Sequence, residues 1–130
     1  MSSDELKERC KAFGLAVITM FKMFPKASEA QILGKQLLRS AISVAANYRA
    51  ACRARSREEF LSKLSIVVEE ADETVLWLEL INDSNTFKVD PSLIEESKQL
   101  LYIMSSDRKT TKTNLQRTKI SKSINQQISK

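Results

Sequence analysis

Two helical stripes of apolar residues, separated by a very short polar link, constrain the fold of this 130-residue chain most strongly. The first stripe runs from Leu37 to Cys52 and the second from Phe60 to Ile81, with an apolar or small residue at every third or fourth position. This spacing keeps the residues on one face of a helix that has about 3.6 residues per turn. Each stripe therefore predicts an amphipathic helix with one buried face.

The link between these two helices contains a pattern that starts a helix. Ser56 followed by Glu59 matches a capping box, in which the serine hydroxyl and the glutamate carboxylate both accept from free backbone amides. A new helix is therefore expected to begin at Ser56. Because the link is so short, the two helices must lie side by side and run antiparallel.

A further helix is predicted before this pair. Its apolar stripe ends at Phe24, with Ser2 or Ser3 as the N-cap. Pro25 is expected to end this helix, since the residue before a proline is pushed out of the helical region. Ser28 is expected to cap the helix that follows.

The last predicted helix begins at a second clear start signal. Asp90 is the expected N-cap, and Pro91 occupies the first helical position, where a proline is tolerated. The apolar stripe then continues to Met104. With only two glycines and two prolines in the chain, the turns that strands need are scarce. We therefore expect an all-α fold, an antiparallel up-down-up-down four-helix bundle of residues 1–104, with helices at about 4–24, 28–55, 57–82 and 91–106.

Residues 105–130 differ in composition from the bundle. They contain seven bases and one acid, and their few apolar residues include Ile120, Ile124 and Ile128, which are spaced by four. Poor helix formers surround these isoleucines. The prediction is a basic, flexible tail, and a helix induced by a partner is the alternative.

The residue types present offer little for catalysis, and no enzyme is expected. There is no histidine, and Cys10 and Cys52 lie on apolar stripes, so neither a metal site nor a cofactor is predicted. Glu69, Glu70 and Glu73 share one side of a helix, but the di-iron pattern also needs Glu-x-x-His motifs. No apolar run is long enough for a membrane span or a signal peptide, which favours a cytoplasmic protein.

The charges are sorted along the chain. Residues 39–63 contain six bases and two acids, whereas residues 64–83 contain six acids and no base. Two interpretations remain open: the arginines pair with these acids within or between subunits, or they bind a phosphate backbone together with the basic tail. In the second interpretation, the candidate nucleic-acid contacts are Arg39, Arg49, Arg53, Arg55, Arg57, Lys63, Arg108, Lys109, Lys112, Arg117, Lys119 and Lys122.

Polar positions along the two central helices carry a resemblance to a known family. They are Gln36 and the Leu-Leu-Arg-Ser-Ala run after it, Ser43, Ala46-Asn47, Arg55-Ser56, Glu59-Phe60-Leu61 and Leu64. Over about residues 5–104 the chain resembles the four-helix-bundle proteins encoded by intervening sequences in bacterial 23S rRNA genes. Many members have a proline before the Ala-Asn pair, where this chain has Ala45, so a straighter second helix is expected.

The resemblance implies an accessory role rather than an enzymatic one. A related branch, the accessory variability determinants of diversity-generating retroelements, forms basic homo-pentamers that partner a reverse transcriptase and RNA. Trp77 and Leu80 lie off the main stripe of their helix, which also favours self-association. The expected function is an oligomeric RNA- or DNA-binding protein, and the alternative is a protein-protein interaction module with no nucleic-acid role.

Overall fold

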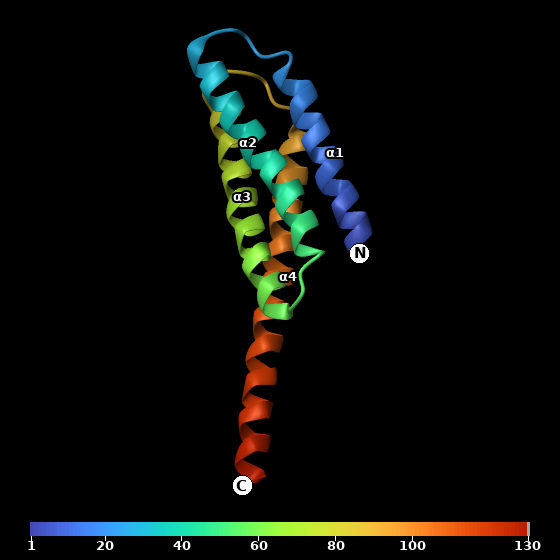
Figure 1. The fold of residues 1–130 in the computed structure, drawn as a ribbon. Coiled ribbons are helices and arrows are strands. Elements are labelled where there is room, and N and C mark those ends of the chain that lie inside the picture. Colours follow the sequence, from blue (N-terminus) through green and yellow to red (C-terminus); the bar gives the residue numbers. More distant parts are fainter. Residues whose placement is uncertain (130) are drawn as a thin grey trace.

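Four α-helices make up the fold in the computed structural model, which describes residues 1–129 (Figure 1). Successive helices run in opposite directions, and residues 1–129 contain no β-strand, so the predicted all-α bundle is confirmed. Their bounds are α1 Ser3–Phe21, α2 Ser28–Ala51, α3 Arg57–Asp83 and α4 Pro91–Ile128.

The predicted helix starts are largely present. Ser2 caps α1 by accepting from the amide of Glu5 at 3.1 Å, and Asp90 caps α4 by accepting from the amide of Ser92 at 2.9 Å. Pro91 is the first residue of α4, as predicted. Ser28 is not a cap, because it lies inside α2 and the position before it is an alanine without a side-chain acceptor.

The capping box at the start of α3 differs from its expected form in one bond. The hydroxyl of Ser56 accepts from the amide of Glu59 at 3.0 Å, as predicted. The carboxylate of Glu59 accepts from the amide of Arg55 at 3.1 Å rather than from that of Ser56. The carboxylate thus also holds the turn that connects α2 to α3.

The predicted apolar stripes form the core. The largest side chains that are almost fully shielded from solvent include Leu37 of α2, Leu64 and Leu78 of α3 and Leu100 of α4. A buried polar pair lies between α2 and α3, where the hydroxyls of Ser40 and Thr74 are 2.9 Å apart. Both hydroxyls also lie within hydrogen-bond distance of a backbone carbonyl in their own helix, so the pair is satisfied within the core.

The connection from α1 to α2 packs three aromatic rings at one end of the bundle. The rings of Phe21 and Phe24 are 5.5 Å apart between centroids, and those of Phe24 and Phe87 are 4.8 Å apart. α1 ends at Phe21, earlier than predicted, because the chain continues in a tighter turn in which the amide of Phe24 donates to the carbonyl of Phe21. α2 also ends earlier than predicted, at Ala51, so that residues 52–56 form the turn to α3.

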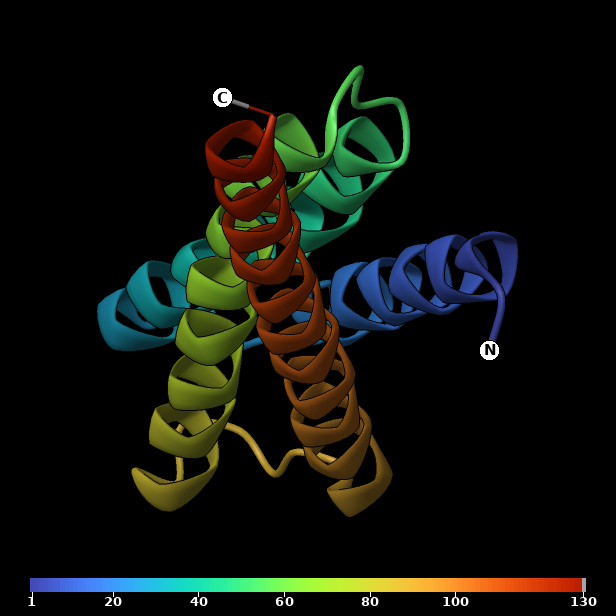
Figure 2. The same cartoon turned by 90° about the horizontal axis from the view of Figure 1, so that it is seen from below.

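The prediction that the fourth helix ends near residue 106 is wrong. α4 continues to Ile128, and its buried residues continue to Thr111. No proline or glycine interrupts the chain after Pro91, so weak helix propensity alone does not end the helix. The part of α4 after Thr111, here called the α4 extension, starts beside α3 and then projects beyond the turn between α2 and α3 (Figure 1). In the view from below, α4 lies in front of the other helices (Figure 2).

Candidate nucleic-acid interface

Basic residues from one turn and two helices gather at the end of the bundle where α4 leaves it. The turn after α2 carries Arg53 and Arg55, and Arg57 is the first residue of α3. The α4 extension starts beside the same end of α3 (Figure 1). There, Lys112 and Lys119 line a groove with Glu58. Residues far apart in the sequence thus form one surface, here called the basic end.

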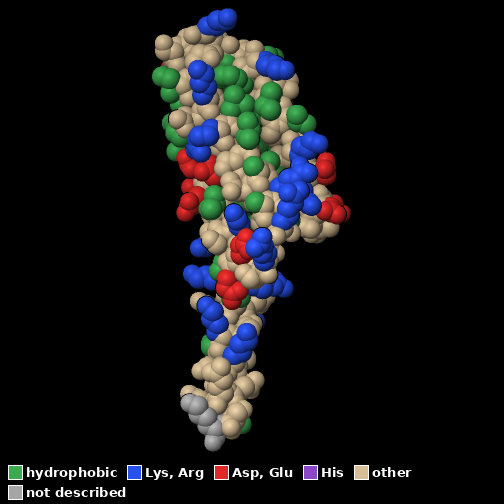
Figure 3. Space-filling model, viewed as in Figure 1, with side chains coloured by type: hydrophobic (Ala, Val, Ile, Leu, Met, Phe, Trp, Pro, Cys, Tyr) green, Lys and Arg blue, Asp and Glu red, His purple; other side chains and the backbone are tan. Residues whose placement is uncertain are grey.

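The basic end has a large excess of positive charge. Residues 53–63 and 105–122 together contain ten bases and three acids. In Figure 3, blue side chains lie around the place where the α4 extension leaves the bundle and along its first part, with a few red side chains among them. Most of the bases are exposed and form no ion pair within residues 1–129; they are Arg53, Arg55, Arg57, Lys109, Lys112, Arg117, Lys119 and Lys122.

The three acids of the basic end only partly offset these charges. Glu59 is held in the cap of α3 by its bond to the amide of Arg55. Burial raises the pKa of the Asp107 carboxyl, while the nearby amino terminus lowers it. Glu58 lines the groove with Lys112 and Lys119.

Arg39 lies outside the basic end. Its guanidinium donates to the carboxylates of Glu70 and Glu73 of α3, each at 3.0 Å. For this arginine, the arrangement matches the interpretation that the arginines pair with the acids of the next helix, here within one chain. Arg39 is ten residues before Arg49 on α2, which corresponds to about 15 Å along the helix.

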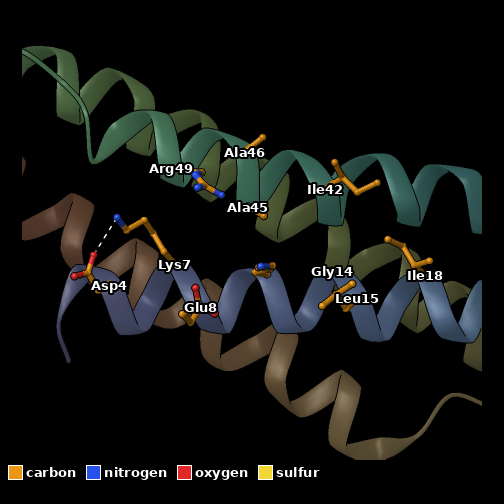
Figure 4. Close-up of a pocket in the computed structure, with 11 residues that line it drawn as sticks. Asp4, Lys7, Glu8, Gly14, Leu15, Ile18, Ile42, Ala45, Ala46 and Arg49 are labelled. Carbon is orange, nitrogen blue, oxygen red and sulfur yellow. Dashed lines mark ion pairs between the residues drawn. The ribbon is translucent and has the colours of Figure 1, made fainter.

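Three other candidate bases are placed by their packing. Arg108 is half-buried, and its Nε donates to the hydroxyl of Ser65 at 2.8 Å, which fixes α4 against α3. Lys63 is also half-buried. Arg49 is exposed but points into a separate groove between α1 and α2 (Figure 4).

This groove, of about 530 Å³, is the feature that sequence reasoning missed. Gly14 of α1 and Ala45 and Ala46 of α2 leave the space, and exposed apolar side chains such as Leu15 and Ile42 line it (Figure 4). A surface ion pair between Asp4 and Lys7, 3.0 Å long, lies at its rim. The available signal was the presence of small residues, Gly14 in one predicted helix and Ala45 and Ala46 in the next.

The strongest pKa shifts belong to the core rather than to a reactive site. Burial raises the pKa of the Cys10 thiol to about 12, and it also raises the pKa of the Tyr48 hydroxyl, to which the neighbouring Cys52 adds. Raised pKa values of this origin leave both groups neutral and poorly nucleophilic. Within residues 1–129, no three His, Cys, Asp or Glu side chains are grouped as a metal would need.

The outer face of α3 is also only partly as predicted. Leu80 is exposed, but Trp77 is half-buried and packs against the core, with its ring nitrogen shielded from solvent.

In the described part of the chain, none of the helices is both long and apolar enough to span a membrane.

These features define a small antiparallel four-helix-bundle protein with an extended, basic last helix. Comparison with known families identifies it further: the chain belongs to the family of 23S rRNA-intervening sequence proteins, whose model matches residues 4–106. The matched range ends before the α4 extension begins.

A solved structure supports this assignment. The chain is 30% identical, with a TM-score of 0.73, to a protein of unknown function from the S23 ribosomal protein family of Bacteroides thetaiotaomicron VPI-5482. The similarity covers 84% of this chain and 99% of that one. A comparison with curated proteins found no significant match.

Proposed function

We propose that this chain is a non-enzymatic accessory protein that assembles with further copies of itself and binds RNA or DNA without reading the base sequence. The observation that carries the proposal is the gathering of exposed bases from the turn between α2 and α3, the start of α3 and α4 at the basic end. Lysine and arginine on such a surface neutralise backbone phosphates, and this interaction supplies most of non-specific nucleic-acid affinity.

The shape of the basic end suits a nucleic-acid backbone. The α4 extension is about 25 Å long, which corresponds to about seven base pairs of duplex. Lys112, Lys119 and Lys122 lie within one side of this helix, because their separations of seven and three residues are close to whole turns. A row of bases at this spacing contacts several phosphates in succession.

Assembly would multiply this surface. A particle with several copies presents several basic ends, and simultaneous contacts raise the overall affinity without any new kind of contact. The resemblance described above suggests five copies. Sedimentation of the purified chain measures that number directly.

Replacing bases by glutamine, at either end of the bundle, tests the proposal. One variant combines Arg53→Gln, Arg55→Gln and Arg57→Gln at the basic end. A matched control combines Lys22→Gln, Lys26→Gln and Lys35→Gln at the opposite end, where the residues are also exposed and the change in charge is the same. Binding of a generic RNA and of duplex DNA is followed by fluorescence anisotropy.

The proposal expects the two variants to behave differently. The basic-end variant should lose roughly tenfold or more in affinity for both nucleic acids, while the control should change little. Equal losses in both variants would mean that only net charge matters. No binding of the unmodified chain at low salt would overturn the proposal.

A second candidate function is a protein-protein interaction module. The ion pairs of Arg39 with Glu70 and Glu73 favour it, because they show charge used for packing between helices. In that case the same titrations show no nucleic-acid binding, while the chain still sediments as an oligomer.

A further inference from the structure

The groove between α1 and α2 has two ends of different character. Lys7 and Arg49 lie at one end, and Ile18 and Ile42 lie at the other (Figure 4). At the apolar end, Leu15 is 56% exposed and Ile42 is 49% exposed. Exposed apolar side chains gathered in a hollow of this size are typical of an interaction surface.

The bases at the polar end of the groove are only partly neutralised. Lys7 pairs with Asp4, but Lys11 and Arg49 are exposed and form no ion pair within residues 1–129. Glu8 is the other acid that lines the groove. A complementary occupant therefore carries exposed acids next to an apolar segment.

The outer face of α3 has this composition. Leu76 is 49% exposed and Leu80 is 41% exposed. Glu69 and Asp72 precede them, are exposed, and form no ion pair within residues 1–129. Separations of four and seven residues keep these four side chains on one side of the helix. Along this side, α3 is acidic first and apolar afterwards.

The groove and the outer face of α3 match in register when α3 lies parallel to α1. With Leu76 level with Ile42, Glu69 is level with Arg49, because each lies seven residues away and α3 is then antiparallel to α2. Leu76 is also level with Leu15, which lines the same end of the groove as Ile42. Leucines then meet the apolar end, and acids meet the basic end.

The same count places a second acid beside a second base. Asp72 lies four residues before Leu76, and Lys11 lies four residues before Leu15. Because α1 and this α3 run parallel, Asp72 and Lys11 are level with each other. Two unpaired acids of α3 thus lie level with the two unpaired bases of the groove.

We infer that the groove between α1 and α2 of one copy holds the outer face of α3 of the next copy. The side chains that face each other are Leu76 and Leu80 with Leu15, Ile18 and Ile42, Glu69 with Arg49, and Asp72 with Lys11. The inference rests on the self-association in the proposed function and names its contact surface.

This contact is compatible with a closed ring. Within one chain, α1 and α3 run in the same direction, so a copy whose α3 lies parallel to its neighbour's α1 points the same way as that neighbour (Figure 1). The groove and the outer face of α3 are different surfaces, so every copy can use both. Contacts of this head-to-tail kind close into cyclic rings, of which a five-copy ring is one.

A small tilt brings the two surfaces to the same height in such a ring. Within one chain, Ser40 lies beside Thr74, so Ile42 is level with about residue 72 and Leu76 lies about 6 Å further along the bundle. Across a bundle about 20 Å thick, a tilt of each copy by roughly 15–20° from the ring axis compensates this offset. Neighbouring helices then cross at roughly 20°, which is a common packing angle.

The contact does not use the bases of the basic end. On α2 the groove ends at Arg49, whereas the basic end begins at Arg53 and continues on α4 from Lys109. Because all copies of the ring point the same way, their basic ends lie on the same side of the assembly. The contact thus gathers the nucleic-acid surfaces of several copies.

Disulfide trapping tests the contact and its head-to-tail character. A chain with Ile42→Cys and Leu76→Cys should give covalent dimers and larger species on mild oxidation without nucleic acid, because each copy is linked to a neighbour on either side. Chains with only one of these cysteines should give dimers only when the two are refolded together. The native thiols offer little background, because Cys10 is buried and Cys52 is half-buried.

The matched control moves one cysteine out of the groove. Ala12→Cys is combined with the same Leu76→Cys, since Ala12 is exposed on α1 but does not line the groove. The control should give several-fold less covalent product. Equal trapping in both chains, or none in the first, would overturn the inference.

Exchanging charges across the contact tests its register. Arg49→Glu should weaken self-association by about threefold to tenfold in sedimentation, because two carboxylates then face each other. Adding Glu69→Arg should restore most of the loss. Adding Glu95→Arg instead, at an exposed acid of α4, makes the same change in net charge and should not restore it. Rescue by neither or by both would show that Glu69 does not face Arg49.

A charge placed in the apolar part of the contact gives an independent test. Leu76→Asp should weaken self-association by about tenfold or more. Tyr102→Asp introduces the same charge on α4, where the side chain is 75% exposed, and should change it little. Circular dichroism verifies that both variants keep their helices.

The outcomes separate this inference from the nucleic-acid proposal. All three tests are made without nucleic acid, so a failure of nucleic-acid binding leaves their results intact. If the unmodified chain sediments as a monomer at tens of micromolar, or if the Leu76→Asp variant associates normally, the contact is wrong whatever the chain binds.

Discussion

Two glycines of the bundle show how strongly a residue's effect depends on its neighbours. Gly34 in α2 lies against Phe21 and Phe24, and a Cβ added there would overlap the ring of Phe21. Gly14 in α1 faces the groove to α2, and a Cβ there would have no other atom within 4 Å. Both glycines lie within helices, where alanine is intrinsically preferred.

The same substitution is therefore expected to have opposite effects at these two positions. Gly14→Ala should stabilise the protein by about 0.5–1 kcal/mol through helix propensity. Gly34→Ala should destabilise it by about 1–3 kcal/mol, because the aromatic cluster must move. Urea unfolding of both variants measures the difference, and equal effects would show that the cluster adapts without cost.

The buried thiol of Cys10 predicts a pH dependence of stability. Burial raises its pKa from an ordinary value of 9.0 to about 12, so the unfolded chain loses this proton first as the pH rises. The free energy of unfolding should therefore fall between pH 9 and pH 12, by up to about 1.4 kcal/mol per pH unit, and Tyr48 should contribute in the same direction.

Urea unfolding of the unmodified chain and of Cys10→Ala over that pH range checks this dependence. The variant starts from a lower stability because it leaves a cavity, but its stability should fall less steeply with pH. Identical slopes in the two proteins would contradict a thiol held neutral by burial.

At the scale of elements, the sequence was a good guide to where helices begin and a poor guide to where they end. Capping side chains act within a few residues, so Ser2, Ser56 and Asp90 could be read locally. The continuation of α4 past residue 106 could not, because Arg108 donates to Ser65 of α3, which is far away in the sequence, and Thr111 is buried in the bundle.

The α4 extension is expected to be the least stable helical segment of an isolated copy. Its residues after about 116 are exposed and rich in poor helix formers, so only local hydrogen bonds hold them. In hydrogen exchange at low protein concentration, these amides should exchange at least about a hundredfold faster than those of α3. Protection that appears as the concentration rises would agree with self-association, and equal protection in dilute monomer would contradict this prediction.

At the scale of the whole molecule, the candidate site was predictable in composition but not in arrangement. The sequence alone shows the excess of bases in residues 39–63 and in the C-terminal segment. It does not show that Arg39 is engaged by carboxylates more than thirty residues away, or that α4 brings its lysines beside the start of α3. Both facts depend on how the helices pack.

The salt dependence of nucleic-acid binding tests the central claim most directly. The affinity of the unmodified chain for a generic RNA is measured over a series of salt concentrations, and compared with a variant that combines Lys112→Gln, Lys119→Gln and Lys122→Gln. Each neutralised phosphate contributes a slope of about −0.7 to −0.9 to the plot of log affinity against log salt. The account predicts a steep slope that becomes shallower by about two units in the variant, whereas a flat slope, or no binding at low salt, would contradict it.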